Sequence, residues 1–276
     1  MSKKQTNSPS CRLTAEQVAS FSQEGFLLYD QPVFAQAEFD ALKAHFEQKL
    51  LELPAGQRPE AMDVPHFSDR SLFRWLLSDT VLDLVEPILG PDIALFSSHF
   101  ICKPKGDGRR VPWHEDSAYW SKLLYPADIV TVWLAIDPST RENGCMYVVP
   151  RSHNTGKKGY SDYERVDTSL NVFPIEIVPG QRTDKKGVPC LLEPNHCSLH
   201  DARTIHGSAA NTSDQRRCGY TMRYMATHVK LNPEVYDLQK VFLARGRAKV
   251  DNPWGDPSTD YGHIHALRAE SLKKFH

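Results

Sequence analysis

Two short segments of the chain contain residue types that bind transition metals. His114 and Asp116 lie two residues apart, and on a β-strand such residues project from the same face. His206, in the run Thr-Ile-His-Gly-Ser, is a candidate third ligand. Two imidazoles and one carboxylate leave coordination positions open, as in non-haem Fe(II) oxygenases. Because the chain has 12 histidines, the alternative is a chance surface pair or a core histidine.

Arg217 is a candidate ligand for 2-oxoglutarate, which would chelate such a metal through its keto and adjacent carboxylate oxygens. Its far carboxylate requires a charged, hydrogen-bonding partner once it is buried, and the planar fork of arginine suits that group. Arg217 follows His206 by eleven residues and begins a strand-like run. Arg216, which alternates to the opposite face of the same strand, is the alternative candidate. Lone arginines are usually solvated, so the distance from His206 is what favours Arg217.

Aromatic residues near the metal ligands are candidates for binding a substrate. Tyr119 and Trp120 follow Asp116 on an expected loop, where they could line a pocket or pack in the core. Ser98 and Phe100 lie two apart on the preceding strand and are expected to face the same cavity.

Two further features have ordinary interpretations that we prefer. His200 is expected to be a core histidine, although a position beside a metal ligand is the alternative. The basic run 103–110 is expected to be a solvated loop. In the alternative, Lys103, Arg109 or Arg110 meets an anionic substrate group at the mouth of the barrel.

The elements that must position these residues are mainly short strands that follow a helical segment. A capping-box pattern at Thr14–Gln17 opens a helix, and helices are also expected at 34–51, 71–77 and 79–89. Gly25–Tyr29 is expected to be a strand, and 233–245 a possible helix. About eight further strands indicate a jelly roll; they are expected at 93–103, 111–115, 129–136, 145–149, 174–178, 189–193, 197–200 and 216–226.

The 276 residues are expected to form one domain, mainly β with packed helices around a double-stranded β-helix (cupin-like) core. The expected parts are a loose arm at 1–11, a mainly helical flank at 12–90, a core at 91–228 and a C-terminal extension at 229–276. Within the core, the long polar stretch 151–186 is expected to act as a lid over the site.

Composition narrows the class of protein. The apolar fraction of 40% suffices for a core, and the formal net charge of −1 gives no reason to expect nucleic acid or membrane partners. None of the six cysteines forms a Cys-x-x-Cys pair, which disfavours a structural zinc site. Scattered cysteines of this kind are typical of reduced thiols in a cytoplasmic protein. The expected partner is a small-molecule substrate, and the oligomeric state stays open.

The chain resembles the phytanoyl-CoA dioxygenase family over roughly residues 12–250. The resemblance rests on Trp113-His-Glu-Asp116, on the run Glu142–His153, on Thr204-Ile-His-Gly-Ser208 and on Arg217. It implies Fe(II) and the co-substrates 2-oxoglutarate and O2, with a jelly-roll core. The implied iron ligands are His114, Asp116 and His206. Arg217 is the implied ligand of the distal 2-oxoglutarate carboxylate, and Trp133 is implied to line the pocket of that co-substrate.

Two departures and several alternatives accompany this resemblance. Glu115 stands where relatives often have glutamine, and it is expected to face away from the co-substrate. The carboxylate Asp116 is retained, whereas halogenating relatives have a small residue there, which favours hydroxylation of an unactivated C–H bond. Desaturation, cyclisation or epimerisation would use the same metal ligands. The third alternative is a non-oxidative, cupin-like ligand-binding protein or isomerase, which would have no use for a buried Arg217.

Overall fold

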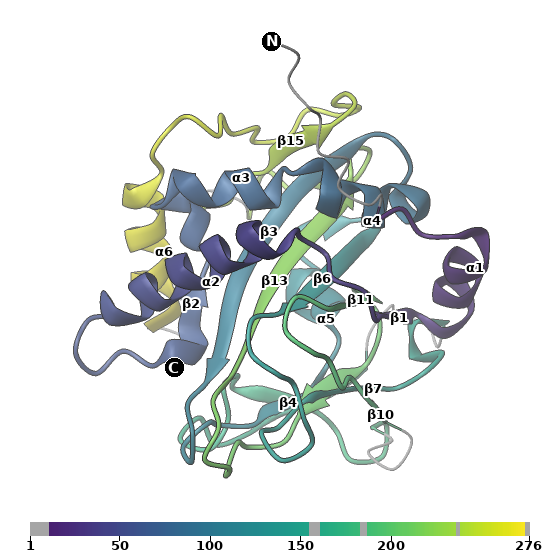
Figure 1. Cartoon of the computed structure of the whole chain (residues 1–276). Coiled ribbons are helices and arrows are strands. Elements are labelled where there is room, and N and C mark those ends of the chain that lie inside the picture. The colour runs from purple at the N-terminus through teal and green to yellow at the C-terminus, as the bar shows by residue number, and fades with distance from the viewer. Residues whose placement is uncertain (1–10, 155–160, 183–186, 236–237, 274–276) are drawn as a thin grey trace.

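Two antiparallel β-sheets face each other, and helices pack against the outer face of the larger sheet in this computed structural model (Figure 1). The structure describes residues 11–154, 161–182, 187–235 and 238–273. The two sheets form the jelly-roll core, which confirms the predicted fold class. The candidate ligands lie between the sheets, so both sheets contribute to the site.

The larger sheet forms the long wall of the molecule. Its strand order is β1-β11-β6-β13-β3-β15, and β2 also pairs with β3. Alternation along each strand gives this sheet one face of apolar side chains toward the helices and one more polar face toward the smaller sheet. The strands are β1 (Phe26–Tyr29), β2 (Met62–Asp63), β3 (Ile93–Lys103), β6 (Ile129–Ala135), β11 (Cys197–Asp201), β13 (Arg217–Ala226) and β15 (Phe242–Arg245).

The smaller sheet closes the other side of the barrel and has the order β10-β7-β12-β4. Its strands are short: β4 (Val111–His114), β7 (Met146–Val148), β10 (Val188–Pro189) and β12 (His206–Ser208). Two further pairs lie outside these sheets, β5 (Leu124–Tyr125) with β14 (Lys230–Leu231), and β8 (Tyr163–Arg165) with β9 (Ile175–Ile177).

Helices bury the apolar face of the larger sheet. In α2, the side chains of Phe39, Leu42 and Phe46 recur at helical spacing and are buried, and Phe46 contacts the ring of Phe100 on β3. Thr14 forms the predicted capping box at the start of α1. The α-helices are α1 (Ala15–Glu24), α2 (Gln36–Leu51), α3 (Phe73–Leu76), α4 (Asp79–Leu89), α5 (Asp116–Trp120) and α6 (Gly262–Lys273); the 3-10 turns are η1 (Pro59–Ala61), η2 (Pro65–Phe67), η3 (Arg70–Leu72) and η4 (Ser152–Asn154).

Several expectations about individual elements were wrong. The strand expected at 111–115 was confirmed to within one residue, since β4 ends at His114, but the loop expected for Tyr119 and Trp120 is the helix α5. The three-residue strand β12 was not expected, because so short a run has no readable periodicity. The described part of 233–245 holds a turn and β15 rather than a helix, since Phe242 packs into a cluster of aromatic rings. Residues 1–10 of the expected loose arm lie outside the described residues, whereas Cys11 is buried.

The six cysteines are buried and none forms a disulfide, as the sequence indicated. They lie as three pairs of neighbours: Cys102 with Cys218, Cys145 with Cys190, and Cys11 with Cys197. Across the residues that the structure describes, no helix combines the length and apolar character needed to cross a membrane.

Candidate metal and co-substrate site

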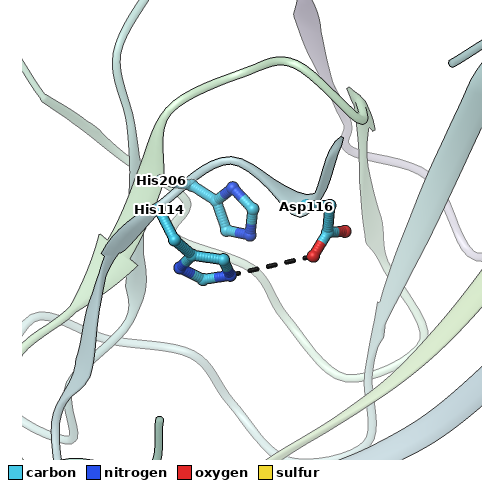
Figure 2. A group of neighbouring side chains, drawn as sticks. All are labelled: His114, Asp116 and His206. Atoms are coloured by element: carbon cyan, nitrogen blue, oxygen red, sulfur yellow. Dashed lines mark ion pairs between the residues drawn. The ribbon is translucent and has the colours of Figure 1, made fainter. Parts of the chain in front are cut away.

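His114, Asp116 and His206 converge between the two sheets (Figure 2). His114 ends β4 and His206 begins β12; the two residues are register partners, and their ring centroids lie 4.1 Å apart. Asp116 is the first residue of α5, and its Oδ1 lies 3.7 Å from the Nε2 atom of His114. One possible ligand atom from each residue lies within 4.8 Å of the others, and all three side chains are buried. The donor set and its spacing fit one metal ion.

Backbone carbonyls orient both imidazoles. The Nδ1 atom of His114 lies 2.7 Å from the carbonyl oxygen of Pro112, and that of His206 lies 2.9 Å from the carbonyl oxygen of Thr204. A carbonyl only accepts, so Nδ1 carries the proton and donates, which leaves Nε2 with its lone pair for a metal. Burial lowers the pKa of both histidines, which favours the neutral, metal-binding form.

The carboxylate of Asp116 is held by neighbours from two strands of the larger sheet. Thr131 on β6 donates to its Oδ2 at 3.3 Å, and the Nε atom of Arg223 on β13 donates to the same oxygen at 3.4 Å. Burial alone would raise the pKa of Asp116, but the charge of Arg223 and the surrounding histidines keep it well below its ordinary value. Asp116 is therefore an anion, ready to bind a cation.

Arg217 is buried in the same pocket without an acidic partner at hydrogen-bonding distance. Its side chain is 1% exposed, its Nε has no hydrogen-bond partner among the described residues, and its Nη2 reaches only Ser208 Oγ, at 3.5 Å. Trp133 on β6 lies beside it, with the ring centroid 5.2 Å from the guanidinium carbon. A buried arginine left this way requires an anion, and the distal carboxylate of 2-oxoglutarate fits that requirement. Arg216 points away, to Glu47 and Asp137, as alternation predicted.

Lys103 is a second cation at this end of the pocket, and the sequence interpretation of it was wrong. It was expected in a solvated loop, but it is fully buried on β3, directly opposite Arg217 on β13. Its ammonium group donates to the carbonyl oxygen of Ala209. Burial and the charge of Arg217 both lower the pKa of Lys103. Arg109 and Arg110 instead bond to the segment 168–176.

The expected substrate residues divide into two groups. The ring of Tyr119 lies 5.6 Å from that of His114, so Tyr119 is beside the metal site. Trp120 lies further from the metal site, where its ring packs against that of Phe96 and faces the guanidinium group of Arg223.

Ser98 and Phe100 do not face the cavity, which corrects the expectation. The Oγ atom of Ser98 bonds to His66 and Tyr220, and the ring of Phe100 stacks on that of Tyr220, on the helix side of β3. The two residues do share a face, as spacing predicted, but β3 is buried on both sides and its pattern does not show which face is which. Ile101 is the β3 residue that lines the pocket.

Some pocket residues escaped the sequence reasoning. Arg223 lies six residues after Arg217 on the same strand, so period-two alternation places both on the pocket face. Thr131 could have been found in the same way from Trp133. Phe173, whose ring centroid lies 5.2 Å from that of His114, comes from an irregular stretch where no pattern could have indicated it.

The stretch expected to be a lid contacts the site through its described part. Glu115 faces away from the pocket and accepts hydrogen bonds from the backbone N–H of Ser161 and from the hydroxyls of Ser161 and Tyr163. Glu176 accepts from Arg110 and from the backbone N–H of Trp113. These bonds connect residues 161–176 to both ends of β4. The lid itself stays a prediction.

A site of this kind, between the sheets of a jelly roll, defines a class: metal-dependent oxygenases that use a dicarboxylate co-substrate. Within that class, the chain belongs to the phytanoyl-CoA dioxygenase (PhyH) family, whose profile matches residues 21–219. The match confirms the resemblance found in the sequence, and with it the family's Fe(II) and 2-oxoglutarate.

Relatives of known name differ in what they act on. The chain is 31% identical over 150 residues to phytanoyl-CoA dioxygenase domain-containing protein 1 of Danio rerio, which covers 52% of this chain and 47% of that protein. It is 29% identical over 147 residues to the peroxisomal phytanoyl-CoA dioxygenase of Homo sapiens, covering 52% and 42%. The match thus spans less than half of these two relatives. An L-proline trans-4-hydroxylase of Streptomyces griseoviridis is 25% identical over 202 residues, covering 64% and 75%.

Solved structures share the fold. ThoJ, described as a non-haem monooxygenase, superposes with a TM-score of 0.69 at 20% identity, covering 93% of this chain and 95% of ThoJ. SnoK, a non-haem α-ketoglutarate-dependent carbocyclase from nogalamycin biosynthesis, gives a TM-score of 0.63 at 21% identity, covering 82% and 88%. At these identities the likeness shows the fold alone.

Proposed function

We propose that the protein is an Fe(II)- and 2-oxoglutarate-dependent dioxygenase that hydroxylates an unactivated C–H bond of a small organic substrate, with 2-oxoglutarate converted to succinate and CO2. The observation that carries this proposal is the buried Arg217, which lacks an acidic partner and lies in the same pocket as the three candidate metal ligands. A structural metal site would not need such an arginine. The family to which the chain belongs supports the same chemistry.

The residues of the chain have separable tasks in this function. His114, Asp116 and His206 would hold Fe(II), which supplies O2 activation when it is bound. Arg217 would bind the far carboxylate of 2-oxoglutarate and so fix the direction in which the co-substrate enters. Trp133 would pack beside that carboxylate.

Two aromatic side chains, Tyr119 and Phe173, would exclude water from the pocket. The rings of Tyr119 and Phe173 lie 5.5 Å apart, and each lies against His114. Their apolar surface would help to keep bulk water from a bound metal, which protects a reactive site from side reactions.

The test is an anaerobic titration of the Fe(II)-loaded protein with 2-oxoglutarate, monitored by the visible charge-transfer band of the chelate. Arg217→Ala should weaken 2-oxoglutarate about 100-fold, because a charge-assisted bidentate pair is lost, with Fe(II) binding retained. Arg216→Ala, on the opposite face of the strand, is the matched control and should titrate like the wild type.

The possible outcomes separate the candidate functions. No band with metal bound would favour a non-oxidative binding protein, and unchanged affinity in Arg217→Ala would sink the assignment of that residue. Once a substrate is found, product mass distinguishes hydroxylation, which adds one oxygen, from desaturation or cyclisation.

A further inference from the structure

The pocket contains an arginine that neither the metal nor the 2-oxoglutarate carboxylate accounts for. Arg223 projects from β13 into the pocket, and only 10% of its side chain is exposed. Of the five N–H donors of its guanidinium, one, on Nε, bonds to Asp116. Among the described residues, the other four have no hydrogen-bond partner. The Nη edge of the fork is therefore available to a ligand.

His200 lies beside Arg223 in the pocket wall and is also without a hydrogen-bond partner. It is 1% exposed, and neither ring nitrogen has a partner among the described residues. Its Nε2 atom is 3.9 Å from Asp116 Oδ2, too long for a hydrogen bond, and its ring centroid is 4.6 Å from that of His206. A buried imidazole in either neutral form has one N–H to donate, and the acceptor opposite Nε2, Asp116 Oδ2, lies beyond hydrogen-bonding distance.

The charges of the pocket are not balanced by the metal and co-substrate. Arg217 and Arg223 contribute two positive charges and Asp116 one negative charge, so the protein supplies a net positive charge. Fe(II) and the 2-oxoglutarate dianion cancel each other. Two further acids lie nearby and have partners elsewhere: Asp63 is paired with Arg268 at 3.0 Å, and Glu115 accepts hydrogen bonds from Ser161 and Tyr163. An anionic substrate would restore neutrality in a buried site.

We propose that Arg223 and His200 form the anion subsite for the substrate, so that the substrate is a small carboxylic acid whose carboxylate lies on the Nη edge of Arg223 beside the metal. The inference rests on the proposed function and adds the substrate class to it. Trp120 helps to hold the guanidinium in place, with its ring centroid 5.5 Å from the Arg223 guanidinium carbon. The arginine then connects substrate and metal ligand through two different edges.

The experiment measures the binding of matched acids and amides by calorimetry. The protein is loaded with Ni(II), which does not turn over, and saturated with 2-oxoglutarate so that acids cannot occupy the Arg217 end. The probes are three pairs of different shape: proline and prolinamide, phenylacetate and phenylacetamide, hexanoate and hexanamide. At least one acid should bind, with its amide about tenfold weaker or worse.

Substitutions then test whether Arg223 and His200 cause the preference for the acid over its amide. Arg223→Gln, whose amide can still donate to Asp116, should abolish the preference for the acid, and Arg223→Lys should retain part of it. The affinities for Ni(II) and 2-oxoglutarate are measured in each variant, so that acid binding is compared only in loaded protein. His200→Leu, which leaves the arginine in place, should weaken the acid several-fold. Arg216→Gln removes an arginine one residue from Arg217 on the opposite face and should change nothing.

Three results would overturn this proposal: amides that bind as well as acids, an acid preference that survives in Arg223→Gln, or no acid that binds at millimolar concentration. Each of these leaves 2-oxoglutarate binding intact and so touches only the substrate class. Failure of the wild-type protein to bind 2-oxoglutarate would instead reject the proposed function itself.

Discussion

Lys103 and Arg217 face each other across β3 and β13, and both are buried. Two adjacent positive charges in a site of low polarity would repel each other, so burial and Arg217 lower the pKa of Lys103 and disfavour its charged form in the protein without its co-substrate. A bound carboxylate would relieve the repulsion. The sequence indicated the role of Arg217 from its spacing, but Lys103 belongs to a Gly-rich basic run typical of solvated loops. Its burial depends on contacts distant in sequence: the backbone of Gly108 packs closely against its side chain, where no Cβ would fit.

At the residue scale, Lys103→Met should therefore have opposite effects on stability and binding. The apo protein should gain about 1 kcal/mol or more in free energy of unfolding, because a buried amine that is destabilised by desolvation and by Arg217 is replaced by an apolar chain of similar shape. Its affinity for 2-oxoglutarate should fall about tenfold, because one attractive charge is lost. Urea unfolding and co-substrate titration check the two halves, with the exposed Lys105→Met as control. A variant with both quantities lowered would contradict the electrostatic explanation.

At the scale of elements, the packing between the neighbouring strands β13 and β6 positions side chains that line the 2-oxoglutarate site. The indole of Trp133 lies across Gly219 so closely that a Cβ there would approach Trp133 to 2.1 Å. The strands themselves could be read from the sequence, since β3 was predicted with its observed bounds and β6 and β13 to within one residue at either end. The sequence does not show which face of each strand lines the pocket, because all three strands are buried on both sides and lack a polar-apolar alternation.

Gly219→Ala should displace Trp133 and cost about 2 kcal/mol of stability, since the rigid indole and the strand cannot both stay in place. 2-Oxoglutarate binding should weaken with it, because Trp133 lies beside Arg217. Adding Trp133→Phe to Gly219→Ala should restore part of the stability, which unfolding measurements on the double-mutant cycle would show. Gly180→Ala, where a Cβ meets nothing within 4 Å, is the matched control. Additive effects of the two substitutions would mean that the contact does not cause the loss.

On the scale of the whole molecule, the helical layer and the barrel share one core, and a neutral histidine is buried in it. His66 lies among the rings of Phe67, Phe73 and Phe242, and its Nδ1 atom lies 2.7 Å from Ser98 Oγ. Burial lowers the pKa of His66 from 6.5 to about 3. The unfolded chain takes up this proton first as pH falls, so the stability contributed by a neutral His66 is complete above about pH 6.5 and is lost progressively below it.

The free energy of unfolding should fall more steeply below pH 6.5 in the wild type than in His66→Gln, by about 1.4 kcal/mol per pH unit. Glutamine stays neutral and can still bond to Ser98. Urea unfolding at several pH values between 7.5 and 5 measures the slopes, and His228→Gln, at an exposed histidine, should follow the wild type. Parallel slopes for wild type and His66→Gln would show that another group is responsible.

The buried cysteines are distributed so that their thiols can report local opening in three regions of the folded chain. The pair Cys102 and Cys218 lies in the larger sheet, and the pair Cys145 and Cys190 lies beside β7 and β10. The third pair lies where the N-terminal segment, at Cys11, meets Cys197 on β11. A thiol that is covered cannot react with an alkylating reagent until its surroundings open. Mass spectrometry of the alkylated peptides would thus give opening rates for three regions of one molecule, with no probe introduced. Comparing those rates with and without 2-oxoglutarate would show how far the effect of ligand binding extends through the fold.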